Sequence, residues 1–402
     1  MINNSLAVQL KTTFETQKEA RYNPEKLLTG LFGGKHAFAN DLQVSVIVPV
    51  RNEAAHIKQT LEALRIQEDN AGNALRPGFY EVLVLANNCT DQTADIINRY
   101  KRKHPDFPLF IEDIQLPAST ANIGVVRRVL IDAAFRRLNE SGNPNGIIAS
   151  TDGDTIVDRQ WIYHITQEIL NGNDAVGGRI LTKTDRSPAR LYHLRSVMYR
   201  SLLAKAAAII DPSVNDPWPC HFQYFGASLA VTCNMYERAG RLPQVPYLED
   251  NAFLEALNSI DAKVRKSNQV KVYTSTREHG RVEVGFSEQL SKWHSLALSA
   301  SEQLAEPAKA SLLKLQNRFA LRTCRDNYFT NSLQQRELSV IADKLSINAE
   351  WLQKQLSSTT YFGALWQQVE HKMETGTWAK MWKPVPITAA IHELRLFIEK
   401  HR

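Results

Sequence analysis

The feature that most constrains the fold is a regular alternation of short apolar runs and amphipathic stretches between residues 44 and 170. The run VSVIVPV at residues 44–50 is continuous and β-branched, which is typical of a parallel strand covered on both faces. Similar runs begin at residues 80, 108 and 146, and apolar residues at helical spacing follow each of them. This alternation predicts an α/β fold with a mostly parallel sheet flanked by helices.

Composition narrows the class of protein. The chain has 402 residues and is 43% hydrophobic, which is enough for a large core. Its 48 Lys and Arg against 42 Asp and Glu form no dense basic block, so a nucleic-acid partner is not expected. The four cysteines show no CxxC spacing, which favours a reducing compartment. Without a signal peptide or a run of about 18 apolar residues, we expect a cytoplasmic protein with no transmembrane segment.

The pattern changes along the chain. We expect further strands at residues 174–182, 221–231, 262–266 and 270–275, and a helix at 249–259. After Gly285 the chain is helical in pattern. The sequence therefore predicts three parts, which are an N-terminal arm at residues 1–40, an α/β domain at 41–284 and a helical C-terminal region at 285–402.

Polar residues follow the predicted strands where ligands bind in open α/β sheets, beyond the carboxyl ends of the strands. Asn52 and Glu53 follow the first strand and Asp91 follows the second, although helix capping alone would explain Asn52 or Asp91. Asp152 and Asp154 flank a glycine after the fourth strand. Two carboxylates in this position suit Mg²⁺ or Mn²⁺ with open positions for phosphate oxygens, and the alternative is a tight turn with two solvated acids.

Four segments together resemble family 2 glycosyltransferases of the GT-A fold. They are VSVIVPVRNEAAHIKQTLEAL, NNCTDQTADI, STDGDTIVDRQWI and FGASLAVTCNMYERAGRLPQVPYLEDNAFLEAL, within residues 43–283. The resemblance implies a GT-A type sheet for the α/β domain, with the helical region as an extension. It also implies a hexosyltransferase type of enzyme that moves a sugar from a nucleotide-diphosphate donor to an acceptor hydroxyl with Mg²⁺ or Mn²⁺.

The resemblance also assigns roles to residues. Asp152 and Asp154 would hold the donor diphosphate through the metal, and Asp250 would be the catalytic base, with Glu249 as the alternative. Many relatives have an aspartate where this chain has Ala86, so both a UDP-sugar and a GDP-sugar donor remain open. The other positions that would line the donor pocket are Pro49, Asn52, Glu53, Asp91 and Arg128.

Two further segments are candidates for ligand contacts. Arg277 and Arg281 bracket His279 after a predicted strand; the arginines suit phosphate, and the histidine is a candidate third metal ligand. A solvated basic loop is the alternative for all three. Aromatic faces commonly stack on sugars, so the acceptor candidates are Trp218, His221 and Tyr224, with core packing as the alternative.

Other readings of the same residues stay open. The Glu249–Asp250 pair favours inversion, but a retaining transferase acting on a small acid acceptor is an alternative. A sugar-nucleotide nucleotidyltransferase fits less well, because PVRNEAAH lacks the glycines of its first loop. The intact Asp152, Asp154 and Asp250 argue against a non-catalytic binding protein. The C-terminal region is a candidate for a homodimer contact or a lid, and its amphipathic ending is more typical of core packing than of a membrane-surface contact.

Overall fold

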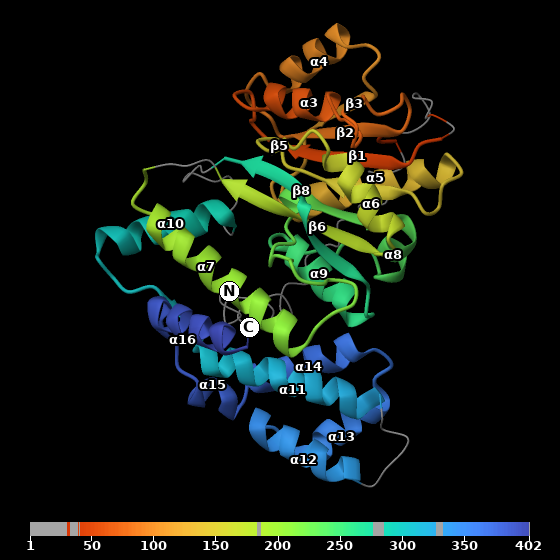
Figure 1. Cartoon of the computed structure of the whole chain (residues 1–402). Helices are drawn as coiled ribbons and strands as arrows, with labels where there is room; N and C mark the ends of the chain where they lie inside the picture. The colour runs from red at the N-terminus through yellow and green to blue at the C-terminus, as the bar shows by residue number, and fades with distance from the viewer. Residues whose placement is uncertain are drawn as a thin grey trace.

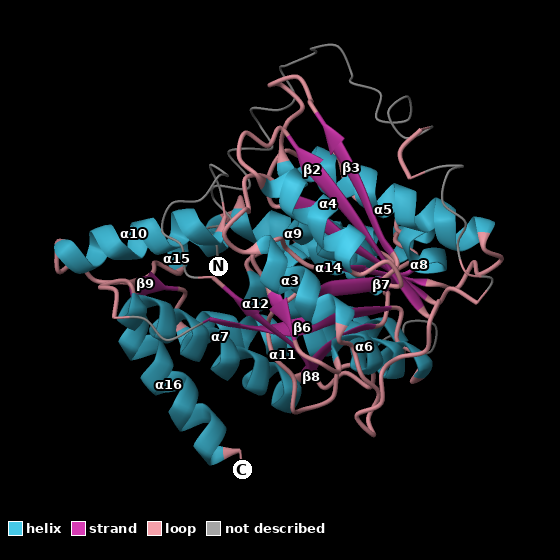
Figure 2. Ribbon diagram, turned by 90° about the horizontal axis from the view of Figure 1, so that it is seen from above, coloured by secondary structure: helices cyan, strands magenta, loops and turns pink. Residues whose placement is uncertain are grey.

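The computed structural model describes residues 30–32, 39, 41–182, 186–275, 285–326 and 333–401, and it confirms the predicted α/β architecture. Helices cover an eight-stranded mixed sheet with the order β3-β2-β1-β4-β7-β6-β8-β5 (Figures 1 and 2). Four neighbouring pairs are parallel, whereas β7 is antiparallel to both neighbours and β5 is antiparallel to β8. The strands are β1 (Val44–Val50), β2 (Tyr80–Asn87), β3 (Leu109–Ile114), β4 (Ile147–Ser150), β5 (Ile156–Val157), β6 (Ala175–Thr182), β7 (Leu229–Thr232) and β8 (Val264–Thr274).

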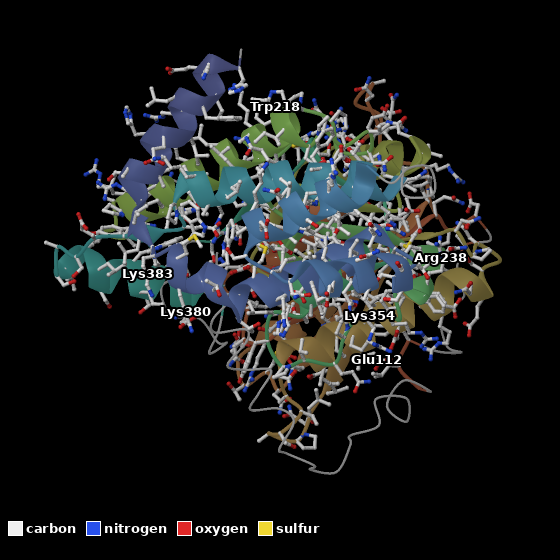
Figure 3. All side chains as sticks on the ribbon, turned by 90° about the horizontal axis from the view of Figure 1, so that it is seen from below. Glu112, Trp218, Arg238, Lys354, Lys380 and Lys383 are labelled. Atoms are coloured by element: carbon white, nitrogen blue, oxygen red, sulfur yellow. The ribbon has the colours of Figure 1, made fainter. Side chains whose placement is uncertain are left out.

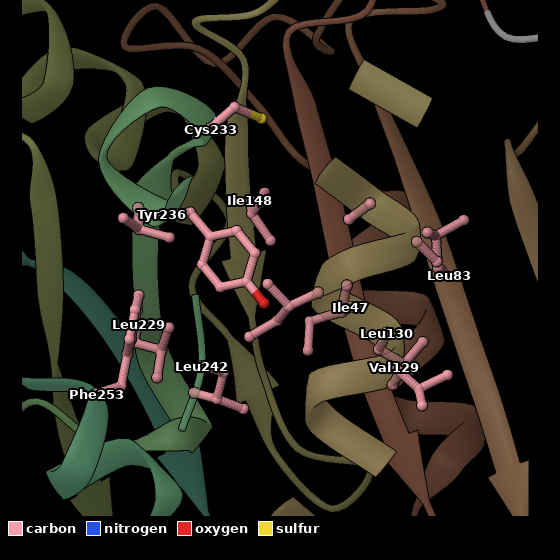
Figure 4. Close-up of a cluster of buried hydrophobic side chains, with 14 of the residues drawn as sticks. Ile47, Leu83, Val129, Leu130, Ile148, Leu229, Cys233, Tyr236, Leu242 and Phe253 are labelled. Carbon is pink, nitrogen blue, oxygen red and sulfur yellow. The ribbon is translucent and has the colours of Figure 1, made fainter. Parts of the chain in front are cut away.

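Helices lie on both faces of this sheet, which explains the continuous apolar run of β1. Val44, Val46 and Val48 point into one core cluster with α3 (Ile57–Arg65), α4 (Thr93–Lys103) and α6 (Trp161–Leu170). Ile47 points to the other face and packs with α5 (Ile123–Glu140), α8 (Cys233–Arg238) and α9 (Glu249–Ser259), as Figure 4 shows. Side chains of both parities along β1 are therefore buried.

Some predicted elements differ from the observed ones. Only the last part of the strand expected at residues 221–231 is extended in the sheet, because a 3₁₀ turn at Gly226–Ser228 precedes β7. The two strands expected at 262–266 and 270–275 form the single strand β8, with a register shift opposite Gly178 and Arg179. The short β5 and α8 were not predicted, since neither is long enough to show a period.

The helical C-terminal region packs on the sheet domain through α7 (Arg190–Ile210). Tyr199 and Ala206 of α7 share a buried cluster with Ala308, Ile391 and Leu394. The chain after residue 285 also contains two short antiparallel strands, β9 (Leu304–Ala305) and β10 (Val385–Pro386), which the sequence did not predict. Its helices are α10 (Phe286–Leu298), α11 (Ala308–Asp326), α12 (Leu333–Leu345), α13 (Ala349–Ser358), α14 (Phe362–Glu374), α15 (Thr377–Met381) and α16 (Ile387–Lys400).

A second attachment joins α14 to the segment after α9. The Asp261 carboxylate accepts the backbone N–H groups of Phe362 (2.8 Å) and Gly363 (2.6 Å), which caps the first turn of α14. The helices α11 to α16 thus lie at the end of the molecule opposite α3 and α4 (Figure 1). Within the described ranges, no helix has the length and apolar character needed to cross a membrane.

A buried ion pair anchors the amino-terminal ends of the first strands. The Arg137 guanidinium donates to the Glu81 carboxylate (2.7 Å), and Ser45 donates its hydroxyl to the same carboxylate (2.9 Å). Arg137 also donates to the carbonyl of Phe32 (2.8 Å), so the chain before β1 is held against α5. Both charged side chains are almost fully buried, which makes each dependent on the other.

Removing one partner of this pair tests its importance. We expect Arg137→Met to lower the free energy of unfolding by about 3–5 kcal/mol, because Glu81 is left charged and buried. The matched control is Arg159→Met at the exposed pair with Glu68, which should cost less than about 1 kcal/mol. Urea unfolding measures both. Equal losses in the two variants would contradict this assignment.

Candidate active site

The Asp152–Gly153–Asp154 turn packs directly against the end of β1. A Cβ atom on Gly153 would lie 2.6 Å from Val50 Cγ1 and 3.1 Å from Glu53 Cγ, so a larger residue would push the two segments apart. Thr60 of α3 also donates its hydroxyl to the Gly153 carbonyl (3.0 Å). Glycine at this position therefore brings Glu53 and the end of β1 beside the two carboxylates, and Pro49 is buried in the strand next to them.

Arg127 of α5 lies at the centre of the site, with a side chain that is only 4% exposed. Its guanidinium donates to Asp152 (3.1 Å) and to Glu249 (2.8 Å). It also donates to the Ser150 hydroxyl (2.6 Å) and the Gly226 carbonyl (3.1 Å). One buried cation thus joins the end of β4, the turn before β7 and the start of α9, and it sets the position of carboxylates from two distant segments.

The start of α9 presents two acids in different surroundings. Glu249 is buried in the ion pair with Arg127; burial and the neighbouring Asp250 charge raise the pKa of Glu249, whereas Arg127 opposes that shift. Asp250 is half-buried, and its oxygens accept the backbone N–H groups of Gly226 (2.9 Å) and Asn251 (2.8 Å). Leu248, just before them, has a left-handed backbone (φ 56°), which is uncommon for such a residue and turns the chain into the helix.

The carboxylates at the sheet edge carry more negative charge than Arg127 offsets. Burial raises the pKa of Asp152, Arg127 opposes the shift, and the charges of Asp154 and Asp250 raise the pKa further. The Asp152 side chain is 35% exposed, so a ligand can reach it. The turn carries hard oxygen donors and excess negative charge, and a divalent cation fits this donor set.

The turn offers few side-chain ligands to a cation. Among the residues that the structure places, no three His, Cys, Asp or Glu side chains are grouped as a metal cage. Mg²⁺ is commonly bound by one or two carboxylates together with substrate phosphates and water, so Asp152 and Asp154 would suffice with a bound diphosphate. Asp154 is oriented by the Ser275 hydroxyl, which donates to it (2.6 Å).

Asn52 and Asp91 join the loops that follow β1 and β2. The Asn52 side chain accepts the backbone N–H of Thr90 (2.7 Å), and Asn52 itself has a left-handed backbone (φ 54°). Asp91 accepts the backbone N–H groups of Ala54 (3.1 Å) and Thr93 (3.0 Å). Both residues shape the rim of the site, and the structure brings them together across two loops.

The Arg128 side chain points away from the Asp152–Gly153–Asp154 turn. It donates to Asp132 (2.6 Å) and to the Leu242 carbonyl, on the side of α5 that packs against the segment after α8. The neighbouring Arg127 is the residue that reaches Asp152. The pattern of α5 gives no signal for this choice, because Arg127 and Arg128 each lie three residues before a buried residue, Leu130 and Ile131.

The three acceptor candidates lie in different surroundings. Trp218 is 47% exposed, and Figure 3 shows it at the periphery of the molecule. His221 is buried: it donates from Nε2 to the Ser267 carbonyl (3.1 Å), and its Nδ1 accepts the Gln223 N–H (3.0 Å). Tyr224 is fully buried, and its hydroxyl has no hydrogen-bond partner among the described residues; burial and the Asp250 charge raise its pKa. Of the three, Trp218 alone offers an exposed aromatic face.

Arg277, His279 and Arg281 lie outside the described residues. The described chain reaches Ser275, whose hydroxyl contacts Asp154.

Comparisons with known proteins agree with this geometry. Residues 45–228 match the family model "Glycosyl transferase family 2". This match covers somewhat less than half of the chain. The chain is 30% identical over 139 residues to glycosyltransferase AglE of Haloferax volcanii, covering 34% of this chain and 39% of that one. It is 25% identical over 134 residues to the probable glycosyltransferase YdaM of Bacillus subtilis, covering 33% and 28%. The chain thus spans well under half the length of both relatives.

Solved structures with a similar arrangement include S. aureus TarS 1-349 in complex with UDP. That match has a TM-score of 0.41 and 14% identity and covers 83% of this chain and 92% of TarS 1-349. The mannosyltransferase PcManGT from Pyrobaculum calidifontis, in complex with GDP-Man and Mn²⁺, gives a TM-score of 0.40 and 13% identity over 92% and 91% of the two chains.

His221 makes the stability of the sheet domain depend on pH. Burial lowers the pKa of His221 from 6.5 to about 4, so the unfolded chain takes up this proton first as the pH falls. The contribution of neutral His221 to the free energy of unfolding is complete above pH 6.5. It falls by up to about 3 kcal/mol between pH 6.5 and pH 4. Urea unfolding measures the free energy of unfolding at pH 7.5 and at pH 4.5. The decrease between the two pH values should be smaller for His221→Gln than for the control His371→Gln, which is at an exposed site. An equal loss would contradict the prediction.

Proposed function

We propose that the chain is a metal-dependent glycosyltransferase that moves a sugar from a nucleotide-diphosphate sugar to an acceptor hydroxyl with inversion. One observation carries the proposal: Arg127 holds Asp152 of the donor-side turn and Glu249 beside Asp250 in one buried network. The carboxylates that we assign to the donor and to the base thus belong to one network, and the match of residues 45–228 to the glycosyl transferase family 2 model supports the reaction class.

Asp250 is the better candidate for the base. Glu249 is buried and paired with Arg127, so taking up a proton would weaken the ion pair that helps to hold the guanidinium in place. Asp250 is half-buried and held by the N–H groups of Gly226 and Asn251, which fix its direction while leaving the side chain within reach of an acceptor.

The transfer follows from these positions. The acceptor hydroxyl gives its proton to Asp250 as its oxygen forms a bond to the anomeric carbon of the donor sugar. The bond from that carbon to the phosphate oxygen breaks on the opposite side, and the nucleoside diphosphate leaves. Asp152 and Asp154 would hold a divalent cation, Mg²⁺ or Mn²⁺, which when bound supplies offsetting charge for the diphosphate leaving group. A single displacement of this kind inverts the anomeric carbon.

The base of the donor is either uracil or guanine. Ala86 at the end of β2 is buried and has no polar side-chain group to contact a base, so base selection falls to other residues.

Calorimetric titration tests the proposal. We expect UDP or GDP to bind the wild type in the presence of Mn²⁺ and to bind at least 10-fold more weakly to Asp154→Asn, because one metal ligand loses its charge. Asp250→Asn should keep the nucleotide affinity but lose at least about 100-fold in sugar transfer, because it removes a general base. Asp106→Asn, an exposed acid away from the turn, should match the wild type.

Two outcomes would contradict the proposal. Preferential binding of nucleoside triphosphates would favour a nucleotidyltransferase. If no nucleoside diphosphate binds, with or without Mn²⁺, the proposal that the chain is a transferase would be wrong.

A further inference from the structure

Helix α7 presents large apolar side chains to solvent along one face. Leu191, Leu194 and Met198 are exposed, and their spacing of three and four residues places them on the same side of the helix. The other side of α7 is packed, with Tyr192 against α10 and Tyr199 in the buried cluster with α16. Exposed apolar side chains that gather on one face mark a contact surface more often than scattered ones do.

The same helix carries positive charge and no negative charge. Its sequence contains no Asp or Glu, and its Arg and Lys residues are Arg190, Arg195, Arg200 and Lys205. Two of them belong to the exposed side: Arg195 follows Leu191 by four residues, and Lys205 follows Met198 by seven. This side of α7 therefore combines apolar side chains with cations, and the helix itself supplies no acid to offset them.

A direct contact extends this surface onto the loop that follows the helix. The Lys205 ammonium lies 5.6 Å from the ring centroid of Trp218, and Trp218 is itself exposed at the periphery of the molecule (Figure 3). Tryptophan suits the boundary between water and lipid, because its large apolar ring carries a single N–H donor. We call Leu191, Leu194, Arg195, Met198, Lys205 and Trp218 the α7 face. Its helical part is about 20 Å long, at 1.5 Å per residue.

We propose that the α7 face binds the surface of a membrane that contains anionic lipids. The Leu and Met side chains enter the boundary between headgroups and acyl chains, and Trp218 lies at the level of the headgroups. Arg195 and Lys205 pair with lipid phosphates while their methylene groups stay beside the apolar side chains. The inference does not depend on the proposed transferase function, because no residue of α7 is assigned to the reaction.

A second copy of the chain fits the α7 face less well than an anionic membrane does. A symmetric dimer sets the same patch of both subunits against itself. Two copies of α7 would then bring Arg195 and Lys205 of both subunits together, with no Asp or Glu on either helix to pair with them. An anionic lipid surface supplies the counter-charge that the helix lacks, and it accepts the apolar side chains as well.

Co-sedimentation with lipid vesicles tests the apolar part of the face. We expect the wild type to bind vesicles of phosphatidylcholine and phosphatidylglycerol in equal parts. The double variant Leu194→Glu/Met198→Glu should bind them at least about 10-fold more weakly, because it replaces apolar side chains with charges that the lipid phosphates repel. The matched control is Leu170→Glu, at an exposed leucine of α6, which lies apart from α7 in Figures 1 and 2. This control should bind like the wild type.

The charged part of the face is tested with the same vesicles. We expect Arg195→Gln/Lys205→Gln to bind at least about 10-fold more weakly than the wild type at low salt, because two lipid-facing cations are lost. The difference should shrink at high salt, which screens the attraction. Arg238→Gln, at an exposed arginine of α8, is the control and should bind like the wild type. Vesicles of phosphatidylcholine alone should bind the wild type more weakly than the anionic vesicles.

Three results would overturn the proposal. The first is that the wild type does not bind the anionic vesicles. The second is that Leu194→Glu/Met198→Glu binds them as well as the wild type does, with circular dichroism showing that both are folded. The third comes from sedimentation velocity without lipid: a wild-type dimer that dissociates in the double variant, together with no vesicle binding, would assign the α7 face to a second copy of the chain.

Discussion

The buried guanidinium of Arg127 is the interaction on which the active-site edge depends. It donates to groups in three segments that are far apart in sequence, at Ser150 and Asp152, at Gly226 and at Glu249. The packing leaves no room for adjustment, since a Cβ atom on Gly226 would lie 2.3 Å from one of the terminal nitrogens. The Asp152–Gly153–Asp154 turn and the start of α9 are therefore held in their relative positions by one side chain.

The sheet could be predicted because its strands carry local signals. β1 was predicted with the bounds that it has, since a strand buried on both faces must be apolar at every position. Two pairs of acids were found as motifs, because the members of each pair lie within two residues of each other in the chain. They are Asp152 with Asp154 and Glu249 with Asp250. The strand predicted over residues 221–225 was wrong. Its aromatic residues favour a strand by propensity, but the 3₁₀ turn at Gly226–Ser228 separates this segment from the strand that joins the sheet.

The network of the site could not be predicted, because its contacts are not local. Arg127 and Glu249 are 122 residues apart, and nothing in the pattern of α5 states which of two adjacent arginines faces the sheet edge and which pairs with Asp132. The contacts of helix α7 are equally non-local. It packs on α16, and its Arg200 and Lys205 lie over the rings of Phe222 and Trp218.

We infer that Arg127 holds Asp152 and the Glu249–Asp250 pair in the arrangement that the proposed transfer needs. The most direct test is the release of nucleoside diphosphate from UDP- and GDP-sugars by wild type and by Arg127→Lys, with circular dichroism as the check of folding. Lysine keeps the charge but lacks the fork that reaches Asp152 and Glu249 together. We expect a folded variant with at least about 100-fold slower release. Wild-type turnover in folded Arg127→Lys would contradict it.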